Sequence, residues 1–557
     1  MQDASMTQTA HPKGNEASKR SHFGDGRPSK KRKLQRKLEK KTTVEGTNEE
    51  VLLHEIRSSL SALRFPTSPS EVESEDVPER FTEVDVEITS LSSTGDGLGP
   101  SHGHIFVVPF SIPGDVVRTK VIRHFPEEKY ILADFVKVVK PSHLRDDTRI
   151  KCPYFASCGG CQFQMMDYAD QLRHKKTIVE KAYRNFSGLS SGLVPTVDDI
   201  IGSPQQYGYR TKLTPHFDGP QGGRRKNRNN EQGKRWEEVP PIGFMKKGQR
   251  KTLDIEECPI GTDAVQSGLK RERKRVAENI ESYKRGATLL LRENTKRVPK
   301  DTTGSPGADG VGPVAPEGIP EDAIVTDYPT HTDYKTCITD NNAISTEYVD
   351  SNGLSNPAGA FFQNNNSILP TFTSYIRSHI LTPPSDPFCS SKTFPITNLI
   401  DAYCGSGLFS ITLASLFKST TGIDIAPSSI ECARSNAVAN KVENTNFIAA
   451  DAAALFKEIT YPPDETVVVI DPPRKGCDAS FLSQLMQFGP KRVVYVSCNV
   501  HTQARDLGVL AGQKNADGTE RDGEPMYEIE RLGGFDFFPQ TSHVEGVAFL
   551  TRKDRTE

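Results

Sequence analysis

Hydrophobic and polar residues follow two different patterns in the N-terminal and C-terminal parts of the chain. Between residues 79 and 141, apolar side chains alternate with polar ones, as at Val84, Val86 and Ile88, and glycines separate the runs. Short alternating strands with closely spaced turns predict a small antiparallel β-barrel. From about residue 393, the apolar runs are continuous and alternate with helix-like segments. This second pattern predicts a parallel sheet covered by helices on both faces.

The expected elements of the α/β region can be placed by residue range. Strands are expected at the apolar and β-branched runs 398–402, 421–425, 467–470 and 492–497. A helix is expected at 408–417, because this apolar segment directly follows a glycine turn at the end of the first strand.

Length and composition extend the picture to the whole chain. At roughly 100–200 residues per domain, the 557 residues suggest about three domains. We expect a disordered basic tail and linker at 1–78, the barrel at 79–141, a mixed central domain with disordered insertions at 142–355 and the α/β domain at 356–557. The barrel is interpreted either as an oligonucleotide-binding module or as a packing module without a ligand.

Charge is unevenly distributed, although the formal net charge is only −2. Residues 27–33 form a basic cluster of the nuclear-import type, which is equally compatible with a solvated tail or a weak RNA-binding arm. A second basic segment at 219–251 suits either RNA phosphates or a flexible loop. The Gly- and Pro-rich residues 300–330 predict a disordered insertion.

The hydropathy pattern also bears on location. Because the sequence has no run of about 18 apolar residues, we expect no membrane-spanning helix and no membrane partner. The N-terminal residues lack the apolar core of a secretory leader, which favours an intracellular protein. The nucleus and the cytoplasm are both compatible with this pattern, and the mitochondrion is a further option.

The strongest candidate for a cofactor site is the segment Asp401–Gly407, which reads Asp-Ala-Tyr-Cys-Gly-Ser-Gly. Glycines in a strand-to-helix turn let the backbone approach a ligand, and an acid after the next strand, here Asp424, suits a pair of ribose hydroxyls. The third glycine of the dinucleotide fingerprint is absent, and Leu408 and Phe409 follow Gly407 instead, which favours S-adenosylmethionine over NAD. The alternative is a glycine turn that serves the backbone alone.

Three further candidates lie after or near expected strands. Asp471 precedes two prolines and forms either a rigid edge of the cofactor crevice or a simple strand-ending turn. Cys498 follows a buried run and is either a site residue or an inert packing residue. Glu545 near the C-terminus is either a general base in the same crevice or an exposed acid.

The ten cysteines are too few for a disulfide scaffold. Three of them, Cys152, Cys158 and Cys161, lie close together beside paired glycines, and Cys258 can supply a fourth sulfur. Four thiolates fit either an iron–sulfur cluster, such as [4Fe-4S], or tetrahedral zinc. The spacing therefore predicts a metal site.

Taken in order, these five motifs resemble those of the RNA uracil-5-methyltransferases, and most of all the eukaryotic, fungal-like tRNA (uracil-5-)-methyltransferase branch. The resemblance covers roughly residues 79–557, apart from insertions at 219–240 and 262–345. It implies a TRAM barrel, a central domain with the cysteine cluster and a Rossmann-like methyltransferase domain.

The resemblance also implies roles for single residues. Gln363 in Phe361-Phe362-Gln363, together with Tyr403, Asp424 and Asp471, is expected at the S-adenosylmethionine site. Cys498 matches the nucleophile and Glu545 the general base. The chain departs from the family pattern at three positions, where Thr211 replaces an asparagine, Leu408 a frequent polar residue and Asp424 a common glutamate.

The implied activity is methyl transfer from S-adenosylmethionine to uridine C5, at position 54 in the T-loop of tRNA, by a monomer. Uracil C5 becomes nucleophilic only when a thiolate adds at C6, so the implied route is a covalent Cys–uracil adduct. Ribosomal RNA as the substrate and a noncatalytic RNA-binding iron–sulfur protein are the alternatives. An RNA cytosine methyltransferase is disfavoured, because such enzymes usually carry a Pro-Cys nucleophile motif and here the context is Ser497-Cys498-Asn499.

Overall fold

The structure is a computed structural model of the chain. It describes residues 46–62, 77–220, 236–300, 317–381, 396–450, 456, 459–512, 519 and 525–553. The basic cluster at 27–33 lies outside the described residues, as do 221–235 of the second basic segment and 301–316 of the Gly- and Pro-rich insertion. Contacts along the chain separate residues 1–44 from residues 45–557, and every element below belongs to the second unit.

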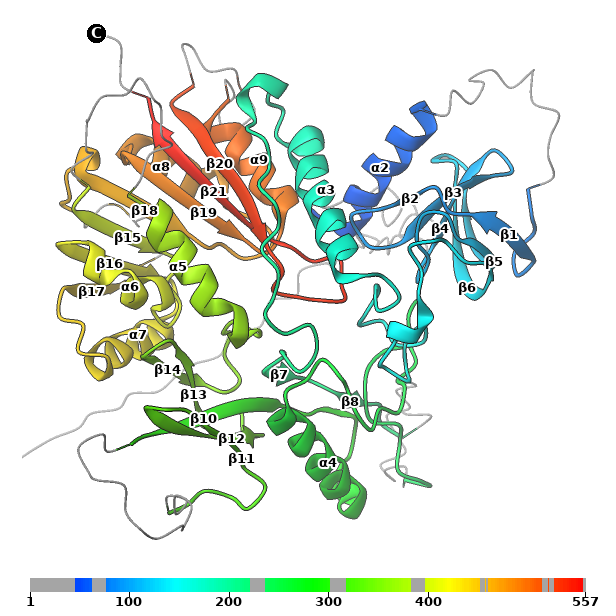
Figure 1. The fold of residues 1–557 in the computed structure, drawn as a ribbon, viewed down its shortest axis with the longest axis horizontal. Coiled ribbons are helices and arrows are strands. Elements are labelled where there is room, and N and C mark those ends of the chain that lie inside the picture. Colours follow the sequence, from blue (N-terminus) through cyan, green and yellow to red (C-terminus); the bar gives the residue numbers. More distant parts are fainter. Residues whose placement is uncertain are drawn as a thin grey trace, which may run out of the picture. The chain divides into compact units, whose positions relative to one another are not determined.

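The N-terminal part of this unit contains a six-stranded sheet (Figure 1). Its strands are β1 (Glu83–Glu87), β2 (Ser90–Leu91), β3 (Gly97–Ser101), β4 (His104–Val108), β5 (Val116–Phe125) and β6 (Tyr130–Lys140). The order is β1-β5-β6-β4-β3-β2, and all neighbours are antiparallel except β4 and β6. A β-rich module therefore lies where the alternating pattern predicted one.

A helix precedes this sheet and corrects the prediction of a disordered tail through residue 78. Helix α2 (Asn48–Ala62) buries Val51 and Ile56, and Ile56 packs with Leu98 and Ile105 of the sheet. The buried Glu55 carboxylate accepts hydrogen bonds from the backbone N–H of Ser93 at 3.0 and 3.1 Å. Sequence composition missed this helix because a few apolar residues are spread among many polar ones.

The middle of the chain is mixed, as predicted. Its helices are α3 (Tyr168–Phe186) and α4 (Asp263–Glu278). Its short strands are β7 (Lys212–Leu213), β8 (His216–Phe217), β9 (Ala287–Thr288), β10 (Leu291–Pro299), β11 (Ile324–Asp327), β12 (His331–Ile338), β13 (Ile344–Val349) and β14 (Asn352–Pro357). They form one four-stranded sheet, β11-β12-β10-β7, and two strand pairs, β8-β9 and β13-β14. Helix α4 packs on the larger sheet through Leu269 against Leu291.

The C-terminal part is a seven-stranded α/β sheet. Its strands are β15 (Asn398–Ala402), β16 (Ser419–Asp424), β17 (Thr445–Ala449), β18 (Thr466–Ile470), β19 (Arg492–Ser497), β20 (Tyr527–Phe535) and β21 (Glu545–Arg552), in the order β17-β16-β15-β18-β19-β21-β20. The first five are parallel, and β21 runs antiparallel between β19 and β20. All four predicted strands are present.

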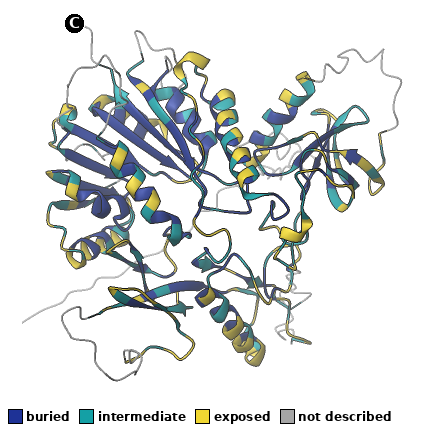
Figure 2. Ribbon diagram, in the orientation of Figure 1, coloured by how far each residue is buried: buried dark blue, intermediate teal, exposed yellow. Residues whose placement is uncertain are grey.

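Helices cover both faces of this sheet, and its strands other than the edge strand β17 are buried along most of their length (Figure 2). The helices are α5 (Leu369–His379), α6 (Leu408–Thr412), α7 (Pro427–Ala439), α8 (Ala479–Phe488) and α9 (Val500–Leu510). In β18, Val467 and Val469 enter one core while Val468 and Ile470 enter the other. Each such fully buried side chain contributes about 1.5–3 kcal/mol.

Two details of this part matter for the site. The helix predicted at 408–417 is α6, which ends at Thr412 and continues as a 3-10 turn at Ala414–Leu416, because the chain must return to β16 within a few residues. Helix α3, although distant in sequence, packs on the same sheet face as α8 and α9 through Ile178 and Ala182. None of the helices within the described ranges is long and apolar enough to cross a membrane.

Candidate active site

A cavity of about 1030 Å³ opens at the carboxyl ends of β15, β16, β18 and β19. All ten residues that the sequence predicted for the cofactor, the chemistry and the metal line this cavity. They are Cys152, Cys158, Cys161, Cys258, Gln363, Tyr403, Asp424, Asp471, Cys498 and Glu545. The structure therefore brings together side chains that lie hundreds of residues apart in sequence.

The turn between β15 and α6 has the backbone that its glycines allow. Gly405 and Gly407 have φ of +53° and +92°, and Tyr403 also lies in the left-handed region, at +64°. Asp424, at the end of the neighbouring strand β16, is hydrogen-bonded to this turn and to the residue two positions after itself. Its Oδ2 accepts a hydrogen bond from the Gly405 N–H (3.1 Å) and its Oδ1 accepts one from Ala426 (2.8 Å). A carboxylate held at the end of β16 fits the ribose position of a nucleoside cofactor.

Gln363 approaches the same cavity from the segment that follows β14. Only 8% of Gln363 is exposed, whereas Phe361 at the cavity rim is 76% exposed. Residues of the central part of the chain hydrogen-bond to this segment. The backbone N–H of Thr211 donates to the carbonyl of Asn364 (2.9 Å), and Arg292 donates to the Asn364 side chain (3.2 Å). Thr211, a departure from the family pattern, thus makes its contact through its backbone.

Asp401 and Asp471 form a pair of interacting carboxyl groups at the ends of β15 and β18. Asp401 is fully buried and accepts hydrogen bonds at Oδ2 from the Ser410 N–H (2.8 Å) and hydroxyl (2.6 Å). Burial raises the pKa of Asp401 to about 7. The pKa of Asp471 is likewise raised to about 7, by burial and then by the charge of Asp401. Both carboxyls therefore resist ionising together.

Sheet register brings Cys498 and Glu545 to the same edge. Ser497 at the end of β19 pairs with Gly546 of β21, so the next positions along this register are Cys498 and Glu545. Burial raises the pKa of Cys498 to about 12, and the charges of Glu545 and Asp471 add to this rise. Burial also raises the pKa of Glu545 well above its usual value, with a further contribution from Asp471. Burial thus favours the uncharged form of both the thiol and the carboxyl group.

Arg474 is a site residue to which sequence reasoning gave no role. It lines the cavity, and both its charge and a hydrogen bond to Cys498 oppose the rise of the thiol pKa. The Arg474 carbonyl accepts hydrogen bonds from the Asn499 side chain (2.9 Å) and the Thr502 hydroxyl (3.2 Å), so the loop after β18 is tied to the start of α9. A cation directly after Asp471-Pro472-Pro473 was the available signal.

His543 was also missed as a site residue. Its side chain lines the cavity two residues before Glu545. Burial lowers the pKa of His543 to about 4, and the positive charges of Arg474, Lys175 and Arg210 lower it further. The imidazole is therefore neutral near pH 7, where it can donate or accept a hydrogen bond but carries no charge.

The four clustered cysteines line the cavity as free thiols. Burial raises the pKa of each, to about 12 for Cys161 and Cys258. Neighbouring sulfurs add to the rise for Cys158, Cys161 and Cys258, and the charge of Glu257 adds to it for Cys152. As a donor set, four sulfurs at one cavity suit an iron–sulfur cluster or zinc. Among the residues that the structure describes, no three His, Cys, Asp or Glu side chains are arranged as a metal site. The metal site stays a prediction.

The fold is shared with a solved structure, that of Pyrococcus abyssi tRNA (uracil-54, C5)-methyltransferase in complex with S-adenosyl-L-homocysteine. The TM-score is 0.54 at 23% sequence identity, over 84% of this chain and 99% of that chain. Together with the crevice at the ends of β15 and β16, this likeness gives the chain the fold of a Rossmann-like methyltransferase.

Comparison of sequences defines the family. Residues 388–553 match the family model described as tRNA (Uracil-5-)-methyltransferase. The chain is 41% identical over 547 residues to the tRNA (uracil(54)-C(5))-methyltransferase of Schizosaccharomyces pombe, which spans 97% of this chain and 90% of the relative. It is 38% identical over 496 residues to the enzyme of the same name from Saccharomyces cerevisiae, spanning 84% of this chain and 73% of the relative.

The chain therefore belongs to the tRNA (uracil-5-)-methyltransferase family. The resemblance drawn from the motifs is confirmed, including its fungal character, since both relatives are fungal proteins.

Proposed function

We propose that this chain is an S-adenosylmethionine-dependent tRNA methyltransferase that forms 5-methyluridine at position 54 in the T-loop. The observation that carries the proposal is the register of β19 and β21, which sets Cys498 beside Glu545 at the mouth of the cofactor crevice. The two fungal relatives bear the name of this activity on uracil 54. A module that only binds RNA needs neither the thiol nor the buried acid.

The residues of the crevice fit S-adenosylmethionine. Asp424 is fixed by two backbone N–H groups and would hold the ribose hydroxyls, while Gln363 and Tyr403 line the same cavity. When bound, the cofactor supplies an electrophilic methyl group. Gln363, Tyr403 and Asp424 bind and orient it, and the apolar wall with Leu408 and Phe409 excludes water.

Cys498 acts as the nucleophile. In its thiolate form its sulfur adds to C6 of the target uracil, and the electron pair of the C5–C6 double bond makes C5 the carbon that accepts the methyl group. Arg474 favours the thiolate by charge and hydrogen bonding, against the burial that disfavours it. The target base must leave its stack to reach the cavity.

Glu545 acts as the general base. It removes the proton from the methylated C5, the C5–C6 double bond re-forms, and the electron pair of the C6–S bond returns to Cys498. To act as the base, Glu545 must first have lost its own carboxyl proton to solvent; once ionised, a carboxylate whose pKa is raised by burial is a strong proton acceptor. The proton then leaves Glu545 for solvent after the product departs.

Several finer assignments belong to the same proposal. The β1–β6 sheet is a TRAM-like barrel that contacts RNA phosphates, and the chain divides into the barrel at 79–141, a central domain at 142–355 and the methyltransferase domain at 356–557. The four cysteines hold a [4Fe-4S] cluster, with zinc as the alternative, and no catalytic step depends on it. The protein is an intracellular monomer.

The test is methylation of an unmodified tRNA transcript by the purified protein, followed by mapping of 5-methyluridine. Wild-type protein should methylate one T-loop uridine and leave ribosomal RNA unmodified. Cys498→Ala should abolish methyl transfer while tRNA binding persists. Cys337→Ala, a half-buried cysteine outside the cavity, is the matched control and should remain active. Full methylation by the Cys498 variant would refute the covalent route, and methylation of ribosomal RNA alone would favour the other substrate.

A further inference from the structure

The loop between β20 and β21, residues 536–544, contains no helix or strand and lines part of the cavity next to Glu545. It places Phe538, Thr541 and His543 on the cavity wall and leads directly into Glu545. A general base must be held to within a fraction of an ångström of its proton, and a loop reaches that accuracy only through contacts with rigid elements. Glu545 is the first residue of β21 and pairs with Phe535 of β20, so the contacts of this loop fix the end of the strand at which its carboxyl group lies.

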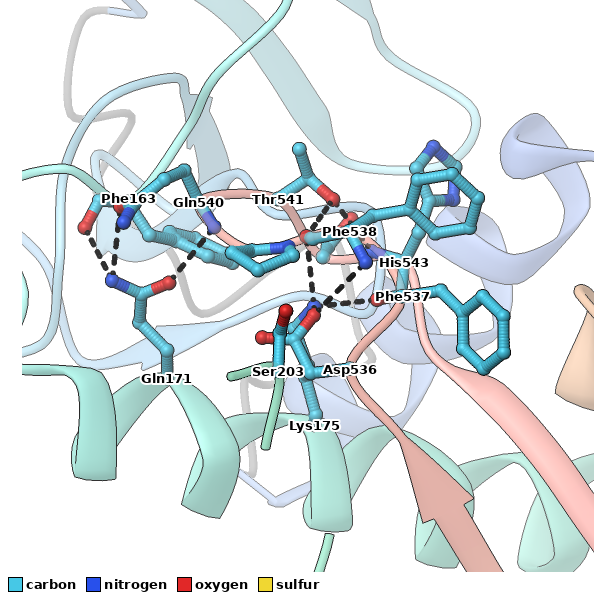
Figure 3. A network of polar contacts seen from close by, with 12 residues as sticks. Phe163, Gln171, Lys175, Ser203, Asp536, Phe537, Phe538, Gln540, Thr541 and His543 are labelled. Atoms are coloured by element: carbon cyan, nitrogen blue, oxygen red, sulfur yellow. Dashed lines mark hydrogen bonds and ion pairs between the residues drawn. The ribbon is translucent and has the colours of Figure 1, made fainter. Parts of the chain in front are cut away.

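Lys175 of α3 makes the most concentrated set of these contacts (Figure 3). Its ammonium group is fully buried and donates to three oxygens of the loop. These are the Asp536 carboxylate (2.5 Å) and the main-chain carbonyls of Phe538 (3.1 Å) and His543 (2.6 Å). An ammonium group has three donors, so all of them are used on residues that lie 361 or more positions away in sequence.

The partner carboxylate is satisfied as well. Asp536 is fully buried, and its Oδ1 also accepts a hydrogen bond from the Phe538 N–H (3.1 Å). Its Oδ2 accepts one from the Tyr168 hydroxyl (2.9 Å), which in turn accepts one from the Ser203 N–H (2.7 Å). A buried ion pair is often no more stable than apolar residues of the same volume. The importance of this pair therefore lies in its geometry and not in added stability, because the contacts of Lys175 hold both ends of the β20–β21 loop.

Gln171, one helical turn before Lys175, fixes the middle of the same loop. Its amide nitrogen donates to the Gln540 side chain (3.1 Å), and its oxygen accepts from the Gln540 N–H (3.1 Å). Gln540 has φ of +71°, a conformation that only such outside contacts maintain in a glutamine. Helix α3 thus holds the loop at its beginning, middle and end from one face, since residues i and i+4 lie side by side.

We propose that Lys175 is a positioning residue for the general base, and that α3 sets Glu545 against the target C5 through the β20–β21 loop. This inference rests on the proposed function of Glu545. According to this inference, helix α3, far upstream in sequence, positions the base for the last chemical step, the removal of the C5 proton. The addition of Cys498 to C6 does not depend on α3. Losing Lys175 should therefore slow release of the adduct and leave its formation intact.

The experiment separates the two steps with two RNAs. Uridine tRNA requires removal of the C5 proton, whereas a transcript carrying 5-fluorouridine stops at the adduct because its C5 holds no proton. The test variant is the double variant Lys175→Met with Asp536→Asn, which removes both buried charges and keeps the Tyr168 contact possible. The control is Lys176→Met, since Lys176 is the next residue on α3 and pairs only with the exposed Asp199 at 2.7 Å.

We expect the double variant to form the fluorouridine adduct at the wild-type rate, to turn over uridine tRNA about 100-fold more slowly and to accumulate a protein–RNA adduct with it. The control should match the wild type with both RNAs. Normal turnover by the double variant would overturn the inference, and so would loss of the adduct with both RNAs, because Lys175 would then support the fold in general. If wild-type protein itself formed no fluorouridine adduct, the proposed function would fail instead.

Discussion

Glu545 has neither of its carboxyl oxygens hydrogen-bonded within the described part of the chain, although only 1% of the residue is exposed. Leaving a buried polar group without a partner is costly, so such a group calls for a functional reason. The raised pKa gives that reason, because a protonated carboxyl group tolerates burial far better than a carboxylate. We therefore expect the protonation state of Glu545 to change when a substrate enters the cavity.

Replacing Glu545 by glutamine should separate methyl transfer from product release. The amide has nearly the same shape but cannot take the C5 proton, so we expect release to slow by about 10²–10⁴-fold. The protein should remain folded, since burial disfavours the charged form of Glu545 and the amide has nearly the same shape without a charge. A denaturing gel should reveal a stable protein–RNA adduct with ordinary uridine tRNA. Free methylated product at the normal rate would contradict the assignment of the base.

Replacing Arg474 by methionine should move adduct formation to higher pH. Arg474 opposes the raised pKa of Cys498, so its loss lets that pKa rise further and lowers the thiolate fraction at a given pH. The measurement is the rate of adduct formation with fluorouridine tRNA as a function of pH. Lys475→Met, at the next residue and outside the cavity, should leave the profile in place. An unshifted profile for the Arg474 variant would show that the arginine does not tune the thiol.

At the scale of the elements, what sequence could predict depended on local pattern. Strands β18 and β19 were placed correctly because their continuous Val and Ile runs have one stable environment, a sheet buried on both faces. Helix α2 was missed, because its burial depends on a surface around Leu98 that local composition does not reveal. Lys175 carried no signal at all, since its partners are three oxygens more than 360 residues away.

The site residues divide in the same way. Cys498 and Glu545 were identified through motifs, but that they are neighbours follows from the antiparallel pairing of β19 and β21. The sequence gives no rule for inserting β21 between β19 and β20. Arg474 and His543 were overlooked because their roles depend on electrostatic contacts with Cys498 and Lys175 across the cavity.

The cysteine cluster offers a test that needs no activity measurement. If it holds an iron–sulfur cluster, protein purified without oxygen should be brown, and Cys258→Ser should lower both the bound iron and the visible absorbance. Zinc instead of iron in the wild-type protein would decide for the alternative. Cys337→Ser is the control, because Cys337 lies outside the cavity. A wild-type protein with neither metal would refute the prediction.

For the whole molecule, the buried acids predict how stability depends on pH. The pKa of Asp401 is raised to about 7 in the folded protein, from a usual 3.8. The folded state therefore binds this proton more tightly than the unfolded state, and the free energy of unfolding falls as pH rises from about 4 to about 7. One such group contributes a slope of up to about 1.4 kcal/mol per pH unit.

Asp401→Asn should remove this contribution, so urea unfolding between about pH 5 and about pH 7 should show a shallower loss of stability. Some slope should remain, because burial also raises the pKa of Asp471. Asp464→Asn changes an exposed carboxylate and should leave the slope unchanged. An equally steep slope in the Asp401 variant would contradict the origin of the effect.

Strand β21, the last that the structure describes, lies inside the sheet between β19 and β20 and begins at Glu545. A ribosome makes a chain from its N-terminus, so Cys498 and the crevice at the ends of β15 and β16 are synthesised before Glu545. Until β21 arrives, β19 lacks one neighbour and β20 lacks the only one it has in the sheet. Chains that end before β21 therefore contain Cys498 but lack Glu545, and under the proposed mechanism they cannot release RNA from a covalent adduct.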